Sequence, residues 1–308
     1  MSEEESNPGS KGRLVDEEFQ NWLHAIGEVC LLARSLRVSI PIAGVGEASP
    51  IINEGIYADR KYGAPELIQL VHRFAQSWTI VVGELVGGIG VLCNEEEVIF
   101  SLLPVVRMIE EYAARVAWLL DDAITADQRI ARALLDELRG FDETVASSSR
   151  MVGRNTGANR HFKGQLQKTR ELILSHFPDA LIVDDSSKWS IGGETFASPT
   201  ETARQFGAHW TNEREWRGTY DHLSACCHPG NAILEFFDAD ANGTPLGIST
   251  KLTAVNFLVS VAMISFRQSI MHLIEYCGLP REDFDLFTEV LEAHFPGILA
   301  DRVESDDD

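Results

Sequence analysis

Three features of this 308-residue sequence predict a mostly α-helical fold. Apolar residues recur at helical spacing along 102–120, so one broad side of that segment is apolar. Thr125 followed by Gln128 three residues later is the pattern of a capping box, which begins a second helix. Residues 252–277 form a third long segment, apolar enough for a helix in the core. These segments and the weaker ones around them predict a single helical-bundle domain of about eight helices.

The remaining helices are expected between stretches rich in glycine, proline and serine. Their predicted ranges are 15–36, 65–92, 159–177, 199–206, 213–227 and 281–294. The helix that begins at Thr125 is expected to end at Gly140, because glycine commonly follows the last turn of a helix. Residues 39–63 and 178–200 are interpreted as irregular connections, and a small β-hairpin is expected around Asn242–Gly243.

The two ends of the chain are acidic and differ in composition from the part between them. We expect residues 1–13 to be a disordered tail, 14–302 one helical domain and 303–308 an acidic C-terminal tail. The N-terminal segment has no apolar run, so it does not resemble a signal peptide. Five cysteines without C-x-x-C spacing indicate reduced thiols and favour a cytoplasmic location. The apolar stretches 79–93 and 252–266 are interpreted as core helices, and no membrane partner is expected.

The formal net charge of −21 limits what the protein can bind. A broad nucleic-acid footprint or an anionic membrane surface needs clustered Lys and Arg side chains, which this composition does not favour. A small local basic site is compatible with the charge. RNA or a small anionic substrate, if bound, is expected at such a local site.

The side of the 102–120 helix opposite its apolar face carries a charged stripe. It consists of Arg107, Glu111, Arg115, Trp118 and Asp122. One interpretation is a solvated face with weak ion pairs four residues apart. The other is a covered groove, because a Trp within a charged stripe is usually covered by another element. In that case Arg107, Glu111, Arg115 and Trp118 are candidate substrate-binding residues.

A second set of chemistry-bearing side chains lies on and just after the helix expected at 213–227. It consists of Arg217, Tyr220, His222, Ser224 and His228, which we take as the candidate catalytic residues. Tyr220, Ser224 and His228 are spaced four residues apart and share one helix face, with Arg217 close to it. Such a set can bind an anion and transfer a proton. The alternative is a polar helix end, with His228 near the negative end of the helix dipole.

Both segments, Arg107-x-x-x-Glu111-x-Ala-Ala-Arg115-x-x-Trp118 and Tyr220-x-x-Leu-Ser224-x-x-x-His228, look like a group of uncharacterised helical proteins of actinobacteria. The second also resembles proteins placed near the HEPN helical superfamily. That resemblance implies a metal-independent ribonuclease that uses an Arg and a His four to six residues apart, and no cofactor. Arg217-x4-His222 fits this spacing, although helical geometry favours His228 as the residue that shares a face with Tyr220. A homodimer is a further expectation.

A rival resemblance is to class I terpene synthases, which are all-α and hold Mg²⁺ between two motifs. Trp118-Leu-Leu-Asp121-Asp122 looks like the aspartate-rich first motif, and Tyr220-Asp221-x-x-Ser224-x-x-x-His228 looks like a degraded second one. The resemblance implies metal-assisted ionisation of an isoprenyl diphosphate, with Asp121 and Asp122 as metal ligands. Tyr220 and His228 stand where the family has oxygen ligands that suit magnesium better. A non-catalytic interaction protein is the third hypothesis.

Overall fold

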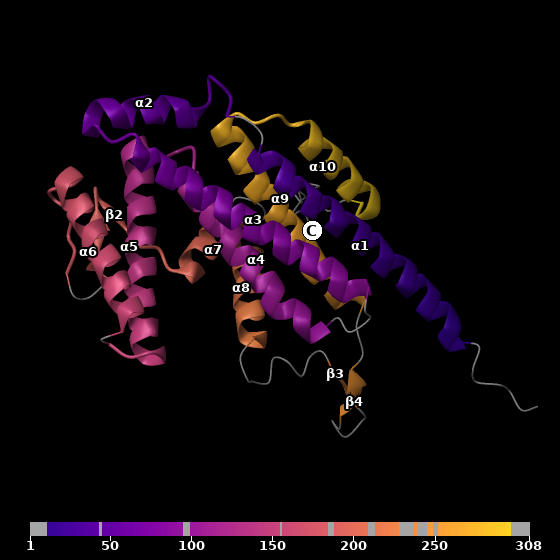
Figure 1. Ribbon diagram of the computed structural model, residues 1–308. Helices are drawn as coiled ribbons and strands as arrows, with labels where there is room; N and C mark the ends of the chain where they lie inside the picture. Colours follow the sequence, from indigo (N-terminus) through magenta and orange to yellow (C-terminus); the bar gives the residue numbers. More distant parts are fainter. Residues whose placement is uncertain are drawn as a thin grey trace, which may run out of the picture.

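The computed structural model describes residues 11–42, 45–94, 99–154, 156–183, 188–208, 213–227, 237–239, 245–248 and 252–296. Within these residues the chain forms ten helices and two small antiparallel hairpins, which confirms the predicted mostly α fold (Figure 1). The helices are α1 (Lys11–Ile42), α2 (Pro50–Tyr62), α3 (Glu66–Asn94), α4 (Ile99–Leu119), α5 (Ala126–Met151), α6 (Gly157–His176), α7 (Pro199–Ala208), α8 (Glu213–Cys226), α9 (Leu252–Cys277) and α10 (Glu282–His294). The strands are β1 (Ser190–Ile191), β2 (Glu194–Thr195), β3 (Phe237–Ala239) and β4 (Pro245–Ile248).

Helix α4 lies at the centre of the bundle. It packs against α3 and α9 on its apolar sides and against α7 and α8 on its charged side (Figure 1). Val106, Ile109, Ala113 and Val116 are completely buried, as their helical spacing predicts. Because both faces of α4 are covered, its charged residues are held inside or at the edge of the protein.

Helices α5 and α6 lie side by side as a pair at one side of the bundle (Figure 1). The capping box at the start of α5 is present: the Gln128 backbone N–H donates to Thr125 Oγ1, and Gln128 Oε1 accepts from the Thr125 N–H. The predicted helix end at Gly140 is wrong, since α5 continues to Met151. A glycine inside a helix costs only about 1 kcal/mol. Packing against α6 outweighs this cost, with Asn159 donating to the carbonyl oxygen of Val145.

Two of the predicted connections contain regular structure. Residues 39–63 include α2, which begins at Pro50 and ends at Gly63 in the left-handed conformation (φ 62°). Proline at the start and glycine at the end are helix-boundary signals that were interpreted as loop composition. Residues 178–200 include the β1–β2 hairpin. Strands β3 and β4 flank the expected turn around Asn242–Gly243, which itself lies outside the described residues.

The N-terminal part of the domain departs from the predicted boundaries. Residues 11–13, expected in the tail, belong to α1. Residues 1–10 and 297–308, which include most of the predicted tails, lie outside the described residues.

Among the residues that the structure describes, two helical segments are long and apolar enough to cross a membrane by length and composition alone. They are Glu66–Cys93 in α3 and Val255–Cys277 in α9. Half of the apolar window of the first segment and 67% of that of the second are buried within the protein. Core helices of soluble proteins have the same properties, so the expectation that both are core helices stays a prediction.

The contact between α1 and α3 depends on Gly90. A Cβ atom at position 90 would lie 2.7 Å from the Cβ of Cys30, whereas a Cβ at Gly88 would meet nothing within 4 Å. We expect Gly90→Ala to lower the free energy of unfolding by about 1–3 kcal/mol, because the two helices must separate. Gly88→Ala should raise it by up to about 1 kcal/mol through helix propensity. Urea unfolding of both variants tests this, and equal effects of the two would contradict it.

Candidate functional site

The charged stripe of α4 is half-buried. Arg107, Glu111, Arg115 and Trp118 are all partly covered, and only Asp122 is exposed. Trp118 packs against the hydrophobic core, so the solvated-face interpretation does not describe this helix. Helix α7 and its preceding linker cover the stripe together with α8. A charge in such a position needs a partner, and the partners come from elements distant in sequence.

The first cluster on the stripe joins the two segments that the sequence analysis singled out. The Tyr220 hydroxyl donates to Glu111 Oε1 at 2.8 Å, across 109 residues of sequence. Arg107 Nε donates to the same oxygen at 2.9 Å, and its guanidinium lies 5.8 Å from the centre of the Tyr220 ring. Burial raises the pKa of the Tyr220 phenol, which keeps it protonated as a donor. The cluster therefore docks α8 on α4.

Among the remaining candidate residues of α8, His222 and Ser224 have side chains that the structure describes. His222 and Ser224 are half-buried, and His222 Nε2 lies 3.7 Å from the Cys226 sulfur. Arg217 belongs to α8, but its side chain lies outside the described residues, as does the whole of His228.

Arg115 lines a cleft of about 670 Å³, here called the Arg115 cleft. Its walls come from α3, α4, α5, the linker before α7 and the first residue of α7. They comprise Phe74, Trp78, Met108, Glu111, Tyr112, Arg115, Asp136, Arg139, Gly140, Glu143, Phe196, Ser198 and Pro199. Arg115 pairs with Asp136 of α5 in this cleft. Its guanidinium lies 5.8 Å from the centre of the Trp78 ring and 5.1 Å from the centre of the Phe196 ring.

Asp136 is the residue of this cleft that the sequence analysis missed. Its side chain is only 3% exposed, and its Oδ2 atom is buried without a hydrogen-bond partner. Burial raises the pKa of Asp136 to about 6, although the guanidinium of Arg115 acts in the opposite direction. An unsatisfied buried carboxylate oxygen is costly, which makes it a strong acceptor for an incoming hydrogen-bond donor.

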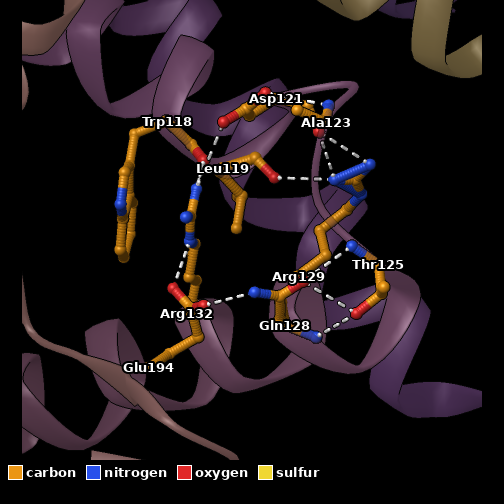
Figure 2. Close-up of polar contacts among 9 residues, drawn as sticks. All are labelled: Trp118, Leu119, Asp121, Ala123, Thr125, Gln128, Arg129, Arg132 and Glu194. Atoms are coloured by element: carbon orange, nitrogen blue, oxygen red, sulfur yellow. Dashed lines mark hydrogen bonds and ion pairs between the residues drawn. The ribbon is translucent and has the colours of Figure 1, made fainter.

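Trp118, Asp121 and Asp122 line a different cleft of about 610 Å³, here called the α4–α9 cleft. The end of α4 is held there by two arginines of α5 (Figure 2). Arg129 donates to the carbonyl oxygen of Asp121 from both terminal nitrogens, at 3.0 Å each. Arg132 donates to the carbonyl oxygen of Trp118 and lies over its ring at 4.9 Å (Figure 2). These contacts satisfy carbonyl groups that a helix C-terminus leaves unpaired.

The fit of Mg²⁺ to Asp121 and Asp122 is poor in the described structure. Asp121 Oδ1 accepts from the Ala123 N–H at 2.9 Å, and Oδ2 lies 3.9 Å from Arg132. The described residues include no group of three or more His, Cys, Asp or Glu side chains that could hold a metal ion. Ser224 does not line this cleft. The α8 docking point at Glu111 lies ten residues before Asp121, about 15 Å along the chain at helical rise.

Helix α7 separates the two clefts. Ser198 and Pro199, at its start, line the Arg115 cleft, whereas Thr202 and Phe206 line the α4–α9 cleft. The charged stripe of α4 is thereby divided: Glu111 and Arg115 face one cleft, and Trp118 faces the other.

Comparison of the chain with protein-family models, curated proteins and solved structures finds no match. The chemistry of the site therefore rests on its own residues.

After Asp136 of α5, Glu110 of α4 is a second buried carboxyl group with unsatisfied oxygen atoms. It is completely buried, and neither of its oxygens has a hydrogen-bond partner. Burial, to which the charge of Glu111 adds, raises the pKa of Glu110 from 4.5 to about 8. The carboxyl group is therefore mostly neutral in the folded protein at pH 7 and ionised in the unfolded chain.

This difference predicts a pH dependence of stability. Because the folded state holds the Glu110 proton more tightly, the free energy of unfolding should fall as pH rises from about 4.5 to about 8. The slope for one proton is at most about 1.4 kcal/mol per pH unit. We expect Glu110→Gln to flatten this decline, whereas the exposed Glu289→Gln should leave it unchanged. Urea unfolding between pH 5 and pH 8 measures both slopes, and parallel curves for the two variants would refute the assignment.

Proposed function

We propose that this protein is a helical ligand-binding protein that takes a small planar heterocycle in the Arg115 cleft. The observation that carries the proposal is the buried Asp136 oxygen without a partner beside the Arg115 guanidinium. An acceptor and a donor side by side match a ring edge that carries an N–H next to a C=O, as in a lactam. The ring N–H would donate to Asp136, and Arg115 would donate to the ring carbonyl.

The walls of the cleft suit a flat ring. The rings of Phe74 and Trp78 are stacked with their centres 5.1 Å apart, and Phe196 lines the same cleft from the linker before α7. Aromatic walls with a few buried polar groups are typical of small-molecule sites, and about 670 Å³ lies within their usual size range.

The charges around the cleft favour a neutral ligand. Arg115 pairs with Asp136, and Arg139 pairs with Glu143 at its rim. Glu111, which also lines the cleft, pairs with Arg107. Because a carboxylate already neutralises each of these arginines, a polyanion gains little here, whereas a neutral ring can use both members of the Arg115–Asp136 pair.

Calorimetric titration with uracil and hypoxanthine tests the proposal. Both present a lactam edge, so we expect both to bind. 1,3-Dimethyluracil has no ring N–H and would leave the Asp136 oxygen unpaired. We expect its affinity to be lower by about tenfold or more, since such a loss costs about 1–3 kcal/mol. Equal affinity for uracil and its dimethyl derivative would contradict the proposed hydrogen bond.

Two glycine variants provide a matched control for the location of the site. Gly140 lines the cleft and Gly164 of α6 does not, and a Cβ atom at either position meets nothing within 4 Å. Gly140→Leu should fill part of the cleft and abolish uracil binding, while Gly164→Leu should leave it unchanged. Retained binding in Gly140→Leu would exclude this cleft as the site.

A metal-independent ribonuclease of HEPN type is a second proposal. The observation that favours it is the Tyr220–Glu111 hydrogen bond, because α8 carries Arg217 and His222 and Glu111 lines the Arg115 cleft. A base bound in that cleft would lie beside the helix with the Arg-x4-His spacing. The terpene-synthase alternative has less support, because Ser224 does not line the α4–α9 cleft, where Asp121 lies. The ligand-binding proposal is compatible with a non-catalytic interaction protein.

The ribonuclease proposal predicts that Arg217→Ala and His222→Ala each abolish cleavage of single-stranded RNA. A chelator should have no effect, because the proposed chemistry moves a proton without a metal. Circular dichroism of each variant serves as the folding control. Intact RNA after incubation with the folded wild-type protein would refute catalysis. The ligand-binding proposal would then be decided by the calorimetric titrations alone.

A further inference from the structure

The α4–α9 cleft carries an excess of negative charge. Its ionisable lining groups are Glu54, Asp121, Asp122, Glu275, Arg129, Arg132 and His272. Asp122 and Glu275 are exposed at the rim, and neither forms an ion pair with the described residues. The net charge of −21 on the whole protein also attracts cations at long range, which adds to the field of these local groups.

The two arginines of the cleft are already engaged. Arg129 is 4% exposed, lies 3.3 Å from Glu54 Oε2 and packs 5.1 Å from the ring of Tyr276. Arg132 pairs with Glu194 at 2.7 Å while it caps the end of α4 (Figure 2). Their donors are used by carbonyl and carboxylate groups of the protein, so an anionic ligand would have to displace them.

A second observation points to a ligand independently of the charges. Gln268 of α9 lines the cleft, is 2% exposed, and its Oε1 atom is buried without a hydrogen-bond partner. A buried amide oxygen without a donor is costly, so a group that donates an N–H from the cleft would satisfy it. Gln268 Oε1 is the one unsatisfied buried side-chain polar atom among the described residues that line the cleft, and it is an acceptor, which complements a cation that carries an N–H group.

The rest of the lining suits an apolar or aromatic body. Trp118, Phe206, Met271 and Tyr276 line the cleft beside Gln268. Aromatic faces attract organic cations and also bury the hydrocarbon part of such a ligand. A bare metal ion would use none of these walls.

We propose that the α4–α9 cleft binds a primary or secondary amine in its ammonium form, attached to an aromatic or aliphatic body. The ammonium N–H donates to the carbonyl oxygen of Gln268, and its charge faces the carboxylates of Asp122 and Glu275 at the acidic rim, which are unpaired within the described residues. The hydrocarbon body lies against Trp118 and Tyr276. This site is distinct from the Arg115 cleft, so the amine proposal can be tested independently of the proposed heterocycle.

Three phenyl-bearing probes with different charged groups test the chemistry. Phenethylamine is expected to bind in calorimetric titration of the wild-type protein. Its N,N,N-trimethyl derivative keeps the charge but has no N–H, and we expect it to bind about tenfold more weakly because Gln268 stays unpaired. Phenylacetate has the same ring and the opposite charge, and no binding is expected. Binding of phenylacetate as tight as that of phenethylamine, or no binding of the amine, would overturn the proposal.

Two variants of α9 locate the site. Gln268→Leu removes the acceptor with little change of volume, and we expect about tenfold weaker phenethylamine binding. Ser265→Ala is the matched control, because Ser265 Oγ is also buried and unpartnered on α9 but does not line the cleft. Its affinity should equal that of the wild type. Thermal unfolding of both variants monitors the fold. Unchanged affinity in folded Gln268→Leu, or an equal loss in Ser265→Ala, would refute the assignment.

Glu275 at the rim offers a variant that does not touch the core. Glu275→Gln should weaken binding about threefold at low salt and reduce its salt dependence, since an exposed charge acts mainly through screened attraction. Glu289→Gln on the exposed surface of α10 is the control. Identical salt dependence in wild type and Glu275→Gln would exclude electrostatic attraction by the rim.

Discussion

The packing of α5 and α8 against α4 depends on the pairing of half-buried charges along α4. One side of the helix is apolar and packs into the core, and the other carries arginines and a glutamate that α7 and α8 also cover. Charges in such a position are stable only when each finds a partner. Glu111 therefore holds Tyr220 of α8, and Arg115 holds Asp136 of α5. The contacts that satisfy α4 are the same contacts that fix its neighbours and shape the two clefts.

Helical periodicity was sufficient to predict the mostly α fold and its central helices. The predicted range 252–277 coincides with α9, and the capping box at Thr125 begins α5. The predicted helix boundaries were wrong where tertiary packing outweighs the local conformational preference of the sequence. Gly140 has the composition of a helix end, yet α6 supports α5 beyond it. Helix α2 was missed because Pro50 and Gly63 mark its two ends and were interpreted as a loop.

The candidate site was predictable only in part. The stripe spacing on α4 identified Arg107, Glu111 and Arg115 as candidates, but the partner of each charge depends on tertiary packing. Asp136 illustrates the limit: on a helical wheel it lies opposite the apolar stripe of Leu134 and Leu138, where solvent is expected. It is buried because α5 is covered on a second side, where Arg115 of α4 meets it. For α5, sequence periodicity identifies one buried face and gives no signal for the second.

The position of α7 as a shared wall has a thermodynamic consequence. Its first residues border the Arg115 cleft, and its later turns border the α4–α9 cleft. A ligand that shifts α7 in one cleft changes the shape of the other, so occupancy of the two would be coupled. Linkage requires that this coupling be reciprocal: each ligand must alter the affinity of the other by the same factor. A ten-residue helix would then be the element through which two chemically different ligands regulate each other.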